Sequence, residues 1–242
     1  MPATRRTAVT AGVLYLVTHV TSITAVLLYR DIGDPARFVA GTGADGPVLL
    51  GSLLEVVLAL AVIGTAVTLF PVVKRQHEGA ALGYAALRTL EAAVITVGVV
   101  PLLALVTVRQ QLAGAPGPET VALAEGLVAL HDWTFLVGPG FVCGTNTVVL
   151  AALLLRSGLV PRPIAVLGLV GGPLVFATNA GVMFGLYDQV SVLTGLGAVP
   201  IFSWEICLAV YLITRGFRRS PVLDGDAAPA LPTAPEPRPV AA

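Results

Sequence analysis

Charged side chains are scarce in this chain, and their scarcity excludes an ordinary soluble domain. Asp, Glu, Lys and Arg make up 12% of the 242 residues, whereas soluble domains average about 25%. Apolar residues make up 56%, and the mean hydropathy is +0.88. A folded chain with so few charges cannot cover its surface with polar groups, so most of that surface must face lipid if the protein is not to aggregate.

Cysteine and histidine are also scarce, and the positive and negative charges balance. Cys143 and Cys207 both lie in apolar runs, without the spacing of a disulfide framework or a zinc site. The three histidines, His19, His77 and His131, fall at different expected depths, whereas a metal site needs clustered ligands. The net charge is zero, which does not indicate a nucleic-acid partner. The sequence therefore predicts no metal, no cofactor and no nucleic-acid partner, and it gives little support to an enzyme.

Six long apolar runs predict an all-α bundle of about six transmembrane helices. A bilayer core is about 30 Å thick, so a spanning helix needs about 20 mostly apolar residues. The runs cover approximately residues 8–29, 47–70, 80–108, 133–155, 164–184 and 192–214. Together they predict one transmembrane domain over residues 1–219. Residues 220–242 are rich in Pro and Ala and predict a disordered cytoplasmic tail.

The distribution of Lys and Arg predicts that both termini are cytoplasmic. One set of segments carries Arg5, Arg6, Lys74, Arg75, Arg156, Arg162, Arg215, Arg218 and Arg219, and the opposite set carries Arg30, Arg37 and Arg109. Cytoplasmic segments are the basic ones, and an even number of spans agrees with two termini on one side. Heavy use of Ala, Gly, Val and Arg suggests a bacterial source. The predicted location is thus the bacterial plasma membrane, with a multi-pass topology.

Residues 118–132 admit two interpretations. They begin with Gly117-Pro118-Glu119, a plausible helix start, and mix apolar with charged residues. They either form a helix along the outer membrane interface or extend the fourth spanning helix.

Ionisable side chains inside the predicted spans are the candidate functional residues, because they are costly in hydrocarbon. Arg88 and Glu91 are three residues apart, which places them on one helix face within ion-pair reach. Glu55 and Glu205 have no such partner in their own helices and are expected to be protonated, hydrated, or bound to a cation or a cationic ligand. The ligand-binding or proton-linked candidates are therefore Arg88, Glu91, Glu205 and Glu55, and the secondary polar candidates are His19, His131, Asp132, Asn146 and Asn179.

A structural role explains part of this set equally well. Polar side chains in membrane bundles also act by hydrogen bonding between helices. This interpretation is favoured for His19, Asn146 and Asn179. Adjacent helical residues point about 100° apart, so His131 and Asp132 do not form a facing catalytic pair, and a water-facing or capping role is expected for both.

Glycines four residues apart can allow close helix contact. Such pairs occur at Gly79/Gly83, Gly140/Gly144, Gly168/Gly172 and Gly181/Gly185. With 26 glycines in the chain, some of these spacings arise by chance.

Three segments of the chain resemble the bacterial membrane proteins grouped as domain of unknown function 4386. They are residues 12–18 (GVLYLVT), residues 87–93 (LRTLEAA), and the run from His131 to Gly168, which includes LRSGLVPR at 155–162. The resemblance covers most of residues 8–214. It implies a multi-helix membrane bundle with no established activity and no catalytic residue to carry over. It places Arg88, Glu91 and His131 at motif positions, and Glu55 and Glu205 outside them.

Three functions remain open. The protein could bind or transport a small polar molecule or ion, in which case the buried acids should converge on one hydrated cavity. It could instead be a structural subunit that contacts the lipid bilayer and a second copy or another membrane partner, in which case the bundle should be closed. The third alternative is an intramembrane enzyme around His131 and Asp132, which should then lie near a second polar cluster.

Overall fold

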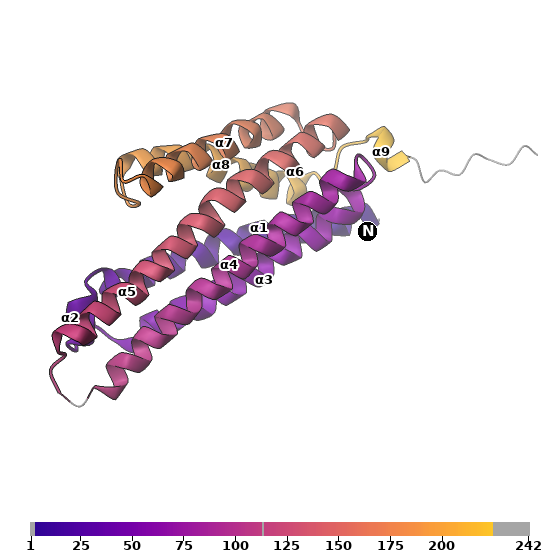
Figure 1. Ribbon diagram of the computed structural model, residues 1–242. Coiled ribbons are helices and arrows are strands. Elements are labelled where there is room, and N and C mark those ends of the chain that lie inside the picture. Colours follow the sequence, from indigo (N-terminus) through magenta and orange to yellow (C-terminus); the bar gives the residue numbers. More distant parts are fainter. Residues whose placement is uncertain (1–2, 113, 225–242) are drawn as a thin grey trace, which may run out of the picture.

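The computed structural model describes residues 3–112 and 114–224, and this part of the chain is built of helices without any β-strand (Figure 1). The elements are α1 (Ala3–Leu28), η1 (Tyr29–Gly33), α2 (Pro35–Val39), α3 (Asp45–Val73), α4 (Glu78–Gln111), α5 (Pro118–Phe135), η2 (Leu136–Val142), α6 (Cys143–Ser157), α7 (Arg162–Met183), α8 (Val192–Thr214) and α9 (Pro221–Asp224).

Six helical stretches in the described residues are long and apolar enough to cross a membrane, which confirms the predicted all-α bundle. They are Thr4–Gly33, Asp45–Val73, Glu78–Gln111, Pro118–Ser157, Arg162–Met183 and Val192–Thr214. Large apolar side chains such as Leu60, Val67 and Val100 are more than half exposed on the outside of the bundle. A lipid-facing surface explains these exposures, because water would penalise them.

Residues 118–132 extend the fourth spanning helix. The stretch Pro118–Ser157 runs for 40 residues through α5, η2 and α6. Pro139 is accommodated by the π-helical turn η2, a common way of fitting a proline into a continuous helix. The interfacial interpretation is not the one observed, because α5 packs along α4 and α2 and buries Ala124 and His131.

The long helices form a closed ring. In ring order, α1 packs on α3, α3 on α4, α4 on α6, α6 on α7, α7 on α8, and α8 returns to α1. The α7–α8 hairpin lies beside α6 and α1, whereas α5 continues past the hairpin along α4 (Figure 1). Such a ring has an interior that all six spans can line.

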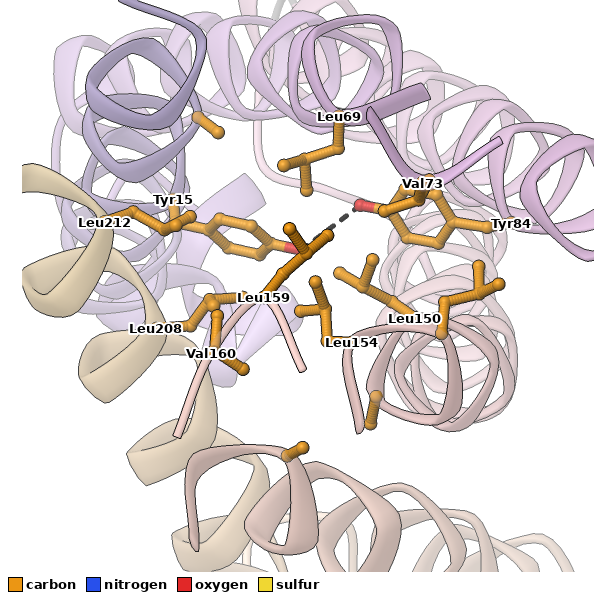
Figure 2. Packing of buried hydrophobic residues seen from close by; sticks show 14 of the residues in the cluster. Tyr15, Leu69, Val73, Tyr84, Leu150, Leu154, Leu159, Val160, Leu208 and Leu212 are labelled. Carbon is orange, nitrogen blue, oxygen red and sulfur yellow. Dashed lines mark hydrogen bonds between the residues drawn. The ribbon is translucent and has the colours of Figure 1, made fainter. Parts of the chain in front are cut away.

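Two apolar clusters occupy the two ends of this interior, and a smaller one of α3 and α4 residues lies between them. One gathers Tyr15, Leu69, Tyr84, Leu154 and Leu212, and the hydroxyls of Tyr15 and Tyr84 are hydrogen-bonded at 3.2 Å within it (Figure 2). The other lies at the far end of the bundle, among α1, η1, α2, α3, α4 and α5. Along α1 and α4 the buried ionisable residues His19, Arg88 and Glu91 lie between the two end clusters. The ends of the interior are therefore apolar, and its middle holds these polar groups beside the small apolar cluster of α3 and α4.

The beginning and the end of the described chain meet at one end of the bundle. The Arg5 guanidinium donates to the carbonyls of Leu212 and Ile213 in the last turn of α8, where a cation is favourable. Ser220, where the predicted tail begins, is buried and donates its hydroxyl hydrogen to the Ser157 carbonyl. Packing thus continues to α9, and residues 225–242 of the predicted tail lie outside the described residues. The side of the membrane on which this end lies stays a prediction.

The turn between α6 and α7 depends on Gly158, which has a φ of 67° and closes α6 in the left-handed conformation. Replacing Gly158 with Ala is expected to lower the free energy of unfolding by about 1 kcal/mol, because L residues are disfavoured there. An added Cβ would meet nothing within 4 Å, so the effect isolates backbone strain. Unfolding by SDS in mixed micelles measures it. Asn, which tolerates this conformation better, should give a smaller loss, and equal losses would contradict the explanation.

Candidate functional site

Arg88 occupies the centre of a buried polar cluster. Its Nη1 donates to Glu91 Oε2 at 3.0 Å, and its Nε donates to the hydroxyl of Thr65 on α3 at 3.2 Å. Asn146 on α6 donates to the same Glu91 oxygen at 2.7 Å. The guanidinium also lies over the Tyr15 ring of α1, 5.2 Å from its centroid. The predicted Arg88–Glu91 pair is therefore present, and it links α4 to three other helices.

Glu205 on α8 completes this cluster with two partners from other helices. Its Oε1 lies 3.7 Å from Arg88 Nη2, and its Oε2 lies 3.6 Å from His19 Nε2. Both separations are longer than a hydrogen bond. Arg88 Nη2 is buried, and within the described residues it has no hydrogen-bond partner. Glu205 and Arg88 thus retain capacity for another polar group between them.

A cavity of about 430 Å³ adjoins this cluster. All six spans contribute to its wall, and the π-helical turn η2 contributes Pro139 and Gly140. Arg88, Glu91, Glu205 and His19 form its polar part, with Asn179 also on the wall. Its other end reaches Gln189–Ser191 in the loop between α7 and α8, where Val190 is 96% exposed. The cavity therefore connects the buried charges with that end of the hairpin.

The rest of the cavity wall is largely apolar. It includes Leu58, Ile95, Phe135, Ile201 and Phe202. The ring of Phe202 packs edge-on against His19, with 4.4 Å between ring centroids. An occupant of this space would meet a hydrophobic wall on most sides and charges at one end.

Glu55 lies in a second buried polar cluster. Its Oε1 lies 3.7 Å from Nε2 of His131 on α5, and Tyr29 places its ring edge-on to His131 at 5.4 Å. Ser52 is also buried here, one turn before Glu55. In the described part of the chain, Tyr29 Oη, Ser52 Oγ and Glu55 Oε2 have no hydrogen-bond partner. The prediction of a water-facing or capping role for His131 is therefore wrong, because α5 packs on α4 and buries the ring.

Both buried histidines have their protons fixed by backbone carbonyls. His131 Nδ1 lies 3.0 Å from the Gly98 carbonyl, and His19 Nδ1 lies 2.9 Å from the Tyr15 carbonyl. A carbonyl only accepts, so each Nδ1 carries a hydrogen and donates it. Each Nε2 then faces a glutamate, Glu55 or Glu205.

The predicted candidates thus separate into two groups. Arg88, Glu91, Glu205, His19 and Asn146 converge on one cluster, and Asn179 lines the cavity while donating to the Val175 carbonyl of its own helix. Glu55 and His131 form the second cluster. Asp132 belongs to neither, since it is exposed.

Thr65, Tyr15, Tyr29 and Ser52 are cluster members that sequence reasoning missed. A helical spacing points to one of them, because Ser52 lies three residues before Glu55 and thus on the same face of α3. No group of three or more His, Cys, Asp or Glu side chains among the described residues could hold a metal ion.

Fold and site together define a multi-pass membrane protein whose helices surround a partly polar cavity. The chain matches the family described as domain of unknown function (DUF4386) over residues 10–216, and it belongs to that family. Neither the curated proteins nor the solved structures contain a significant match to it.

Proposed function

We propose that this protein binds a small, partly apolar molecule with a positively charged group in the cavity beside Glu205. The observation that carries the proposal is the position of Glu205. Its carboxylate lines the cavity and is held by Arg88 and His19 only at 3.6–3.7 Å. A cationic group that entered from the α7–α8 loop would reach this carboxylate without breaking a hydrogen bond of the described residues.

The charge balance of the cavity favours a cation. The cavity wall carries one arginine, Arg88, and two glutamates, Glu91 and Glu205. Glu91 accepts hydrogen bonds from Arg88 and Asn146, so Glu205 is the carboxyl group left to a cationic ligand. Phe202 and Phe135 offer aromatic faces that attract cations, and the apolar wall suits a hydrocarbon body.

Transport is the extension of this proposal. The distribution of Lys and Arg favours a bacterial plasma-membrane location with both termini cytoplasmic, which would direct the α7–α8 loop outward. The cavity would then open to the outside, while the cluster around Tyr15 and Tyr84 closes its cytoplasmic end. A change that opened this cluster would give alternating access.

A structural or partner-binding subunit is the second candidate. The interhelical hydrogen bonds of Arg88 and Asn146 favour it, because they also fix the packing of the bundle. An enzyme around His131 has less support, because His131 and Glu55 are not among the residues that line the cavity beside Glu205.

Labelling by dicyclohexylcarbodiimide in native membranes, read by mass spectrometry, tests the cation site. Glu205 is expected to label, because the reagent is apolar and this carboxyl faces an apolar cavity. Tetraethylammonium should reduce the labelling several-fold, and the Glu205→Gln variant should lose the labelled peptide. Exposed Glu119 is the control acid, whose reactivity the cation should not change. Labelling of Glu205 that tetraethylammonium leaves unchanged would reject the proposed site and favour the structural subunit.

A further inference from the structure

Four arginines surround a hollow at the opposite end of the bundle from the α7–α8 loop. The hollow has a volume of about 490 Å³ and is lined by Leu155, Arg156, Ser157, Gly158, Val160, Arg162, Arg218 and Arg219. Half of these residues are arginines, and none is acidic. The cavity beside Glu205 shares no residue with it.

The chain converges on this hollow from three segments. Arg156 lies in the last turn of α6, and Arg162 is the first residue of α7 after the turn at Gly158. The segment after α8 is tied back to this turn, since the Arg218 amide donates to the Leu159 carbonyl at 2.9 Å. The Ser220 hydroxyl donates to the Ser157 carbonyl and also holds this segment against the turn between α6 and α7. Backbone hydrogen bonding therefore places Arg218 and Arg219 beside Arg156 and Arg162.

Among the side chains that the structure describes, this arrangement concentrates positive charge without a neutralising carboxylate. Among the described residues, none of the four arginines has a carboxylate within 4.0 Å. Like charges gathered around one hollow repel one another, so their proximity is unfavourable unless an anion binds between them. The general excess of basic residues at cytoplasmic helix ends explains why arginines occur here. It does not explain why backbone contacts hold four of them around one space.

We infer that this hollow binds a phosphate-bearing anion, and that its position selects the headgroup of an anionic phospholipid. The hollow lies where α6 ends and α7 begins, which is the level of the lipid phosphates for helices of this kind. Arginine binds phosphate through two parallel N–H groups, so four guanidiniums can enclose one headgroup. The inference is independent of any ligand in the cavity beside Glu205.

Native mass spectrometry of the full chain in detergent tests this assignment. The protein is titrated with phosphatidylglycerol, with phosphatidylcholine and, separately, with inorganic phosphate. We expect phosphatidylglycerol to bind roughly tenfold more tightly than phosphatidylcholine, and the Arg156→Gln/Arg218→Gln variant to lose about that factor. The variant retains the Arg218 backbone amide and with it the contact to Leu159. Glu205→Gln should leave lipid binding unchanged.

The matched control is Lys74→Gln/Arg215→Gln, which removes two positive charges from the same end of the bundle but outside the hollow. It should change lipid binding by no more than about twofold. Equal losses in the two variants would overturn the inference in favour of a diffuse surface attraction. The absence of any preference for phosphatidylglycerol would overturn it as well. Tight binding of inorganic phosphate with no lipid preference would reject the lipid and assign the hollow to a free anion.

Discussion

Replacement of Arg88 with Ala is expected to lower the free energy of unfolding by about 3–5 kcal/mol, the usual effect of removing one partner of a buried ion pair. Arg88 is 2% exposed and Glu91 is 4% exposed. Without Arg88, Glu91 retains Asn146 but loses its only cation within the described residues. The uncompensated carboxylate, rather than the lost attraction alone, accounts for the size of the effect. Unfolding by SDS in mixed micelles, followed by circular dichroism, measures it.

The control variant is Arg30→Ala, which removes an exposed arginine and should change the free energy of unfolding by no more than about 0.5 kcal/mol. The double variant Arg88→Met/Glu91→Met should recover part of the loss, because it removes the buried charge together with its partner. A single Arg88 variant as stable as the control would show that the pair contributes nothing to the fold. In that case the cluster would have to be explained by ligand binding alone.

The sequence was sufficient to predict the Arg88–Glu91 pair and insufficient to predict the partners of the other acids. The pair follows from a three-residue spacing in one helix, which local geometry decides. Glu205 is paired with His19 from α1, and Glu55 with His131 from α5. Those pairings depend on how the helices close into a ring, and a single sequence does not encode that arrangement in any local pattern.

The difference between local patterns and packing between helices also explains why the apolar spans were predictable and the burial of His131 was not. Six spans were predictable because hydropathy along the chain is a local property. The burial of His131 was not, because it results from α5 packing against Gly98 of α4. An added Cβ at Gly98 would approach the Thr134 side chain more closely than ordinary contact allows, so a glycine is needed where α5 passes. A glycine in α4 thus positions a histidine in α5, and no motif links them.

The glycine pairs show that a four-residue spacing alone does not identify a contact between helices. Gly144 and Gly172 bring the backbones of α6 and α7 into direct contact, since a Cβ at either one would lie within 3.0 Å of the carbonyl oxygen of the other. At Gly83 an added Cβ would meet nothing within 4 Å. Gly172 and Gly83 each lie four residues after another glycine, yet only Gly172 lies against the backbone of a neighbouring helix. The neighbouring helix, rather than the spacing, therefore decides the role of each glycine.

A Gly→Ala substitution is therefore expected to destabilise the protein at Gly172 and to stabilise it at Gly83. Gly172→Ala should lower the free energy of unfolding by about 1–3 kcal/mol, because the new methyl group would overpack a contact between two backbones that have no flexible side chain to move. Gly83→Ala should raise it by about 0.5–1 kcal/mol, because alanine is the better helix former and the space is open. Both are measured by SDS unfolding. Gly144→Ala should resemble Gly172→Ala, and the double variant should lose less than the sum, because the first methyl group already separates α6 from α7. If Gly172→Ala instead raised the free energy of unfolding, α6 and α7 would not be in contact there. The part of the cavity wall that these two helices form would then differ from the one described.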